Sequence, residues 1–240
     1  FYYQAAPQLV GPVRSARPTD AELLAPFQPV LAVSGGVDFV LRELQAAGVT
    51  VVDEVTLSGA FQRLERPMPY NLMASFDIVA QQGGGVPPAG EPYPFGEGEF
   101  SGRPASRVAI PFSAATDLEY QYQEDQGGYL RLENGEPFTA LPTFEAQPEP
   151  LILDTVVVQV VAQRSSGYTD ASGSEVPTLD VIGFGPALIF HQGQVLEGEW
   201  RRAAQADGTL FFDEAGRALQ LPPGRLIVEL VPREVDVSWE

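Results

Sequence analysis

A segment rich in glycine and proline divides the chain into two stretches with different patterns of apolar residues. Residues 83–104 contain seven Gly and five Pro. Such a density interrupts helices and central strands, because proline lacks an N–H donor and glycine adds backbone entropy to the unfolded chain. We therefore expect a linker at 83–105 between an N-terminal domain (residues 1–82) and a C-terminal domain (residues 106–240).

The stretch before the linker alternates short β-branched runs with helical patterns. Apolar residues recur at helical spacing in residues 37–47, and Gly48 follows as a helix-ending glycine. Strands separated by helices predict an α/β layer with parallel strand pairing. The expected strands are residues 29–33 and 49–52, and the expected helices are 20–24 (opened by a capping box from Thr19 to Glu22), 37–47 and 71–82.

The stretch after the linker consists of short strand candidates separated by turn residues. Asn134-Gly135 favours a two-residue hairpin turn, whereas residues 164–177 have the composition of a polar loop. The fold class is therefore α+β: an N-terminal α/β layer domain followed by a mainly antiparallel β C-terminal domain. The expected strands are residues 108–112, 118–122, 129–132, 151–162, 187–191, 193–201, 209–212 and 226–231.

Charge and composition exclude several classes of function. The net charge of −18 repels nucleic acid, so we expect no nucleic-acid partner. The chain has no Lys, no Cys and a single His, which excludes Schiff-base lysines, thiolate nucleophiles and His-rich metal sites, and we expect no metal and no cofactor. Residues 1–80 hold 5 Arg against 8 acids, and residues 81–240 hold 9 Arg against 24. An anionic ligand is therefore expected only in the N-terminal domain.

Two arginines follow a Gly-Pro turn near the start of the chain. Residues 1–19 contain no acid, so neither Arg14 nor Arg17 has a local carboxylate. Spaced by three, their side chains share a direction if the segment forms a helical or 3₁₀ turn, and paired guanidiniums bind phosphate or carboxylate. The alternative is that both pair with distant acids such as Asp53 or Asp77.

Two further groups of residues are candidates for the same anion site. Ser34, Gly35 and Gly36 lie between an expected strand and an expected helix, where free backbone amides bind anions in α/β proteins. Arg66 and Asn71 bracket a proline-rich loop that ends at an expected helix N-cap. The alternatives are an ordinary strand–helix turn and a rigid connector with an ordinary cap.

No catalytic residue is identified. His191 precedes an expected hairpin turn and has no second His or Cys with which to form a triad, so we expect it to be structural. If the protein is an enzyme, Asp38 or Asp53 is the candidate base or ligand of a divalent metal beside the arginines.

Residues 10–17, Val-Gly-Pro-Val-Arg-Ser-Ala-Arg, resemble the hallmark of the YerB-type bacterial envelope lipoproteins, a family without an established activity. Two histidines that this family resemblance leads us to expect are replaced, one by Ala32 or Val33 and one by Tyr70, which removes any acid–base role they have. Further resemblances cover nearly the whole chain, at residues 32–36, 66–72, 129–131, 155–159, 183–187, 198–200 and 221–224.

The resemblance implies a two-domain, extracytoplasmic protein attached to the membrane only through a lipid anchor that this chain lacks. The chain opens at Phe1 without an initiator Met, and we expect the N-terminal domain to be incomplete at its start. The leading hypothesis is an envelope protein that binds an anionic, phosphate-bearing lipid or glycan. The alternatives are a phosphoryl or glycosyl-phosphate transferase acting on lipid-linked substrates, and a purely structural envelope protein.

Overall fold

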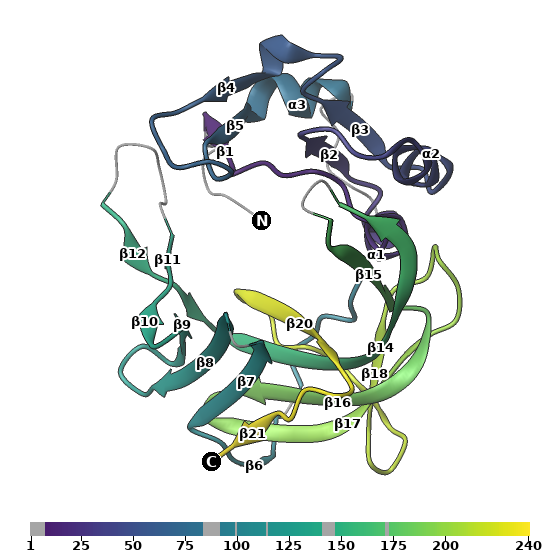
Figure 1. Ribbon diagram of the computed structural model, residues 1–240. Helices are drawn as coiled ribbons and strands as arrows, with labels where there is room; N and C mark the ends of the chain where they lie inside the picture. Colours follow the sequence, from purple (N-terminus) through teal and green to yellow (C-terminus); the bar gives the residue numbers. More distant parts are fainter. Residues whose placement is uncertain (1–7, 84–91, 99, 114, 141–146, 171–172) are drawn as a thin grey trace.

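The computed structural model describes residues 8–83, 92–98, 100–113, 115–140, 147–170 and 173–240 (Figure 1). Strands predominate, and the α-helices of the described chain, α1 to α3, all lie within residues 20–82. The expected α+β class with a β-rich part is therefore confirmed. We call residues 8–83 the N-terminal region and residues 92–240 the C-terminal region.

The N-terminal region contains two small sheets and three short helices. One sheet is antiparallel with the order β1-β5-β4, and the other is the parallel pair β2-β3 that the alternation of strands and helices predicted. Helix α2 ends before Gly48, which adopts the left-handed conformation with φ of 79°, as expected of a helix-ending glycine. The elements are β1 (Leu9–Val10), α1 (Asp20–Leu24), β2 (Val30–Val33), α2 (Asp38–Ala46), β3 (Thr50–Asp53), β4 (Phe61–Arg63), β5 (Leu72–Ser75) and α3 (Phe76–Gln82).

The helix predicted over residues 71–82 is wrong in its first part. Residues Leu72–Ser75 form strand β5, and α3 begins only at Phe76. Leu72, Met73 and Ala74 are all buried, and β5 is paired on both sides, by β1 and β4. Three consecutive buried residues fit a strand covered on both faces, whereas a surface helix buries only one face.

The C-terminal region is built from two larger sheets. A six-stranded sheet has the order β10-β9-β8-β7-β21 with β13 beside β9, and an eight-stranded sheet has the order β15-β14-β16-β17-β18-β19 with β20 beside β14 and β6 beside β17. The β14–β20 pair is parallel, and the other described pairs of these two sheets are antiparallel. The strands are β6 (Arg103–Pro104), β7 (Arg107–Ser113), β8 (Thr116–Gln123), β9 (Gly128–Glu133), β10 (Glu136–Pro137), β11 (Thr139–Ala140), β12 (Glu149–Pro150), β13 (Ile152–Leu153), β14 (Thr155–Thr169), β15 (Glu175–Asp180), β16 (Gly183–His191), β17 (Gln194–Arg202), β18 (Leu210–Asp213), β19 (Ala218–Leu219), β20 (Leu226–Pro232) and β21 (Ser238–Trp239).

Aromatic side chains fill the cores of these sheets. Tyr120, Tyr129 and Phe190 are fully buried in one cluster, and Trp200 and Phe211 in a second. Burying a large aromatic side chain removes roughly 150–250 Å² from water, so these residues dominate the hydrophobic stabilisation of the region. The predicted Asn-Gly hairpin is confirmed, since β9 and β10 flank Asn134 and Gly135, which both have positive φ.

The second half of the expected linker lies against the C-terminal region. Tyr93 stacks on Phe211 with 6.2 Å between ring centroids, and the Leu221 N–H donates to the Pro94 carbonyl. Strand β6 adds to the edge of β17. The expected linker residues 84–91 and 99 lie outside the described residues, as do residues 1–7.

Residues 164–177, expected to form a polar loop, instead belong largely to a hairpin. Strand β14 continues to Thr169 and returns as β15, so that the hairpin reaches the N-terminal region (Figure 1). There Tyr168 meets Phe39 edge to face, and the Leu179 N–H donates to Thr19 Oγ1. Strand pairing satisfies the backbone of this polar segment, and composition alone gives no sign of that pairing.

Candidate functional site

Residues 11–18 connect the two sheets of the N-terminal region. The Val13 N–H donates to the Leu72 carbonyl of one sheet, and the Ser34 N–H after the other sheet donates to the Arg14 carbonyl at 3.0 Å. The segment runs along the edge of the N-terminal region that faces the C-terminal region (Figure 1). It has no helical or 3₁₀ turn, so the turn that was expected to align Arg14 with Arg17 is not formed.

Arg17 folds back on its own segment. Its guanidinium donates to the carbonyls of Ser15 and Ala16, both at 3.1 Å, and its backbone N–H donates to the Asp20 carboxylate at 2.7 Å. Burial raises the pKa of Asp20, and the N–H and the positive charge of Arg17 lower it in part. Arg17 therefore serves the local structure, and the predicted pairing of two guanidiniums on one anion is not supported.

Arg14 keeps its guanidinium exposed. The guanidinium lies over the ring of Tyr70, with 5.4 Å from the guanidinium carbon to the ring centroid. Within the described part of the chain, no carboxylate lies at ion-pair distance from it. A guanidinium stacked through its face still presents its N–H edge, which is the part that binds carboxylate or phosphate.

In the turn between β2 and α2, the Glu54 carboxylate already binds the first candidate residue, Ser34. Ser34 Oγ donates to Glu54 Oε2 at 2.8 Å, so its hydroxyl is already engaged with an anionic side chain. Gly35 has φ of 72°, and a Cβ on Gly36 would lie 3.2 Å from the Cβ of Ala16. The two glycines are therefore explained by backbone conformation and by close packing, and the expected anion site at these amides is not supported.

Asn71 does not cap a helix. Its side-chain oxygen accepts a hydrogen bond from Arg63 at 3.1 Å, and Arg63 also pairs with Glu54 at 2.8 Å. Ser34, Glu54, Arg63 and Asn71 thus form one polar network at the carboxyl ends of β2 and β3. Glu54 and Arg63 were missed from the sequence, because nothing in the spacing of residues 54 and 63 marks them as partners.

Arg66 lies in the loop between β4 and β5 and is exposed. Its backbone N–H donates to the Leu64 carbonyl at 2.8 Å, and the described chain offers its guanidinium no ion pair. Of the predicted ligand residues, Arg14 and Arg66 are thus the two whose charged groups stay available. Tyr70, the residue that replaces an expected histidine, is the aromatic neighbour of Arg14.

The acids and the histidine considered for catalysis have structural surroundings. Asp53 Oδ1 accepts the Val55 N–H at 2.8 Å, and Asp38 lies in the first turn of α2. His191 Nδ1 lies 3.0 Å from Thr155 Oγ1 and 2.9 Å from the Asp154 carbonyl, as expected of a structural histidine. Among the described residues, no group of three His, Asp or Glu side chains is placed to hold a metal ion.

A cavity of about 350 Å³ lies where the two regions meet, away from the predicted ligand residues. Glu22, Glu43 and Arg164 contribute its charged side chains, and none of the seven predicted ligand residues lines it. Nearby, Arg202 is almost fully buried and donates to the Glu22 and Gln205 carbonyls, while burial lowers its pKa. This junction joins the two regions and does not extend the Arg14 site.

Comparisons with known proteins place both parts of the chain. Residues 1–85 match the model of the DUF3048 N-terminal domain, and residues 108–228 match the model of the DUF3048 C-terminal domain, both described as protein of unknown function. The crystal structure of the YerB protein from Bacillus subtilis is similar, with a TM-score of 0.74 and 20% sequence identity, over 97% of this chain and 78% of that one. At this identity the likeness shows a shared fold. No curated protein matches the chain.

No described helix is both long enough and apolar enough to cross a membrane.

Proposed function

The chain belongs to the YerB-type DUF3048 family, whose activity is unknown, and we propose that its N-terminal region binds an anionic, phosphate-bearing ligand at Arg14. The observation that supports this is the state of Arg14 itself, an exposed guanidinium stacked on Tyr70 without a carboxylate partner in the described chain. The guanidinium of a purely structural arginine is instead paired with an acid or folded back on the backbone, as that of Arg17 is.

The distribution of charge supports the same location. Of the nine arginines in the C-terminal region, Arg202 and Arg233 are the two without an ion pair to a described residue. In the N-terminal region Arg63 is paired, and Arg14, Arg17, Arg42 and Arg66 have no such pair. In a chain of net charge −18, an incoming anion is attracted only where cations are left over.

In this proposal the two regions act as two domains with different roles. The N-terminal α/β domain holds the ligand, and the acidic, mainly antiparallel C-terminal β domain is the scaffold and the surface for other interactions. Attachment to the outer face of the cell membrane through a lipid anchor is part of the proposal, and it is supported by the family resemblance at residues 10–17. The ligand is then a phosphate-bearing lipid or glycan of the envelope.

Calorimetric titration with inorganic pyrophosphate tests the proposal. A charge-assisted hydrogen bond contributes roughly 1.5–3 kcal/mol, so Arg14→Ala is expected to weaken binding about 10- to 150-fold. Arg66→Ala is expected to weaken it less, since Arg66 is in a neighbouring loop. The matched control is Arg42→Ala, which removes another arginine without an ion pair, from helix α2, and is expected to leave binding unchanged.

Equal losses in Arg14→Ala and Arg42→Ala would mean that pyrophosphate responds only to the total charge. If the unchanged protein does not bind pyrophosphate, Arg14 does not form a phosphate-binding site. Either result contradicts the proposal.

A further inference from the structure

Three large apolar side chains of the N-terminal region are exposed to solvent. Val55 is 83% exposed, Met68 is 79% exposed and Tyr70 is 56% exposed. They come from the two loops that follow β3 and β4. Single exposed apolar residues are ordinary, but a group of them beside unpaired charges marks a binding surface.

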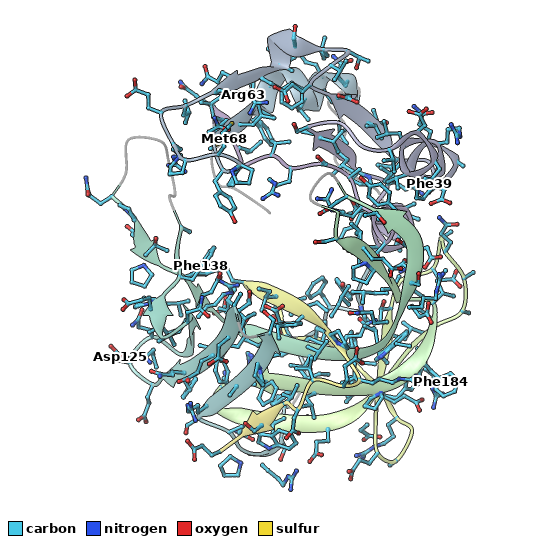
Figure 2. All side chains as sticks on the ribbon, in the orientation of Figure 1. Phe39, Arg63, Met68, Asp125, Phe138 and Phe184 are labelled. Atoms are coloured by element: carbon cyan, nitrogen blue, oxygen red, sulfur yellow. The ribbon has the colours of Figure 1, made fainter. Side chains whose placement is uncertain are left out.

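An ion pair and a hydrogen bond of Arg63 hold these two loops together. Glu54, next to Val55, pairs with Arg63 at 2.8 Å, and Arg63 also binds Asn71, next to Tyr70. The guanidinium of Arg14 lies over the Tyr70 ring. Figure 2 shows Met68 and Arg63 at the same end of the N-terminal region. Tyr70 thus contacts the Arg14 guanidinium, Met68 lies two residues before Tyr70 in the same loop, and Val55 is tied to that loop through the Glu54–Arg63 pair.

The loop that carries Met68 is stiff. Pro67 and Pro69 flank Met68 and fix their own φ angles, and the Tyr70 N–H donates to the Pro67 carbonyl at 3.0 Å. A loop that is already ordered loses little entropy when it binds a ligand. Met68 also adapts to irregular apolar surfaces, because its side chain is unbranched and polarizable.

We propose that the anion bound at Arg14 is the head group of a single amphiphile, an alkyl chain that carries a phosphate, and that the chain lies against Met68 and Val55. This inference rests on the proposed function and adds the class of ligand. Charge complementarity with Arg14 and Arg66 selects the phosphate, and the exposed apolar side chains select the alkyl chain. The net charge of −18 opposes an anionic bilayer as the occupant.

The test compares butyl phosphate with octyl phosphate, both as monomers in solution, by calorimetric titration of the whole chain. Complete burial of one methylene tightens binding up to about fourfold, and burial on one side about twofold. Octyl phosphate, with four more methylenes, is therefore expected to bind roughly tenfold tighter or more. The double variant Val55→Ser/Met68→Ser is expected to remove this difference and to leave the binding of pyrophosphate, which has no alkyl chain, unchanged.

The matched control is Phe184→Ser, which removes a side chain that is 69% exposed in the C-terminal region. It is expected to keep the difference between the two phosphates. Both serine variants replace exposed side chains, so unchanged thermal unfolding is expected and is measured alongside.

The outcomes separate this inference from the function on which it rests. Arg14-dependent binding with equal affinity for the two alkyl phosphates overturns the amphiphile and keeps the proposed function. A difference that persists in the double variant overturns the assigned apolar contacts. Binding of all phosphates that is independent of Arg14 overturns both proposals. A fourth outcome is binding to phosphatidylglycerol vesicles that depends on Met68, while monomeric octyl phosphate does not bind. This outcome overturns the single amphiphile and indicates a membrane surface as the ligand.

Discussion

The two regions of the molecule use their charged and aromatic residues differently. In the C-terminal region Tyr120, Tyr129, Phe190, Trp200 and Phe211 are buried, and most arginines are paired with nearby acids. In the N-terminal region the buried members of the two small hydrophobic clusters are aliphatic, and the arginines are mostly unpaired. A region that neutralises most of its own arginines is suited to be a scaffold, whereas unpaired cations on a small framework are suited to bind an anion.

The largest expected effect is the loss of folding stability at alkaline pH. We expect this alkaline unfolding to begin in the C-terminal region, which holds the buried tyrosines. Burial raises the pKa of Tyr93 to about 12 and raises the pKa of Tyr120 and Tyr129 further, in Tyr120 together with the Glu229 carboxylate. A tyrosine with a raised pKa in the folded state stabilises the fold below its unfolded pKa of about 10, and that stability is lost as the pH rises through the folded pKa. For Tyr93 alone the loss is on the order of 2–3 kcal/mol.

Phenolate absorbance and circular dichroism, recorded together from pH 9 upward, measure this effect. Tyr93→Phe is expected to move alkaline unfolding to higher pH, and Tyr70→Phe, the exposed control, is expected to leave it in place. Phenolate formation by all tyrosines before any loss of structure would show that the C-terminal core does not exclude water as described.

The contact between the regions is expected to have an intermediate effect. Thr19 is buried, and its hydroxyl accepts the Leu179 N–H at 3.0 Å and meets Thr178 Oγ1 at 3.3 Å, instead of capping α1. Thr19→Val leaves that N–H without a partner, at a cost of about 1–3 kcal/mol in the free energy of unfolding, measured with urea.

The control for this contact is Thr56→Val, whose exposed hydroxyl donates only to the Asp53 carbonyl. Asparagine is a good helix cap, so Thr19→Asn separates the two roles of the position. Full stability of Thr19→Asn would indicate that capping, rather than the contact with β15, sets the requirement for Thr19.

Glu54→Gln is expected to have the smallest effect on stability. The ion pair with Arg63 is partly exposed, with side-chain exposures of 26% for Glu54 and 50% for Arg63, and such pairs contribute about 0.2–1 kcal/mol. The substitution also leaves Arg63 without its anionic partner, so pyrophosphate binding in the N-terminal region is expected to tighten.

The matched control is Glu197→Gln, which breaks the ion pair of Glu197 with Arg103 in the C-terminal region and leaves Arg103 without another described acid partner. A comparable gain in pyrophosphate affinity in both variants would remove the distinction between the two regions, because it would mean that any uncovered arginine binds the anion.

Local sequence patterns predicted the elements whose residues interact with near neighbours. The helix at α2, its terminating Gly48 and the Asn134-Gly135 hairpin depend on residues a few positions apart, and all three are present. The pattern failed at Leu72–Ser75, which form a strand paired on both sides by segments that the local spacing does not reveal. It failed also at Thr19, whose capping signal is outcompeted by a partner 160 residues away.

The candidate site shows the same division. The sequence established on its own that this chain is acidic, lacks lysine and cysteine, and begins with an acid-free segment, residues 1–19, that carries Arg14 and Arg17. The tertiary structure then decided which arginine is available. The Arg17 guanidinium donates to carbonyls of its own segment, and Glu54 binds both Ser34 and Arg63. Arg14 stacks on Tyr70 and keeps its guanidinium unpaired. Charge is a property of each residue, whereas a free guanidinium depends on which groups the folded chain places within hydrogen-bond distance.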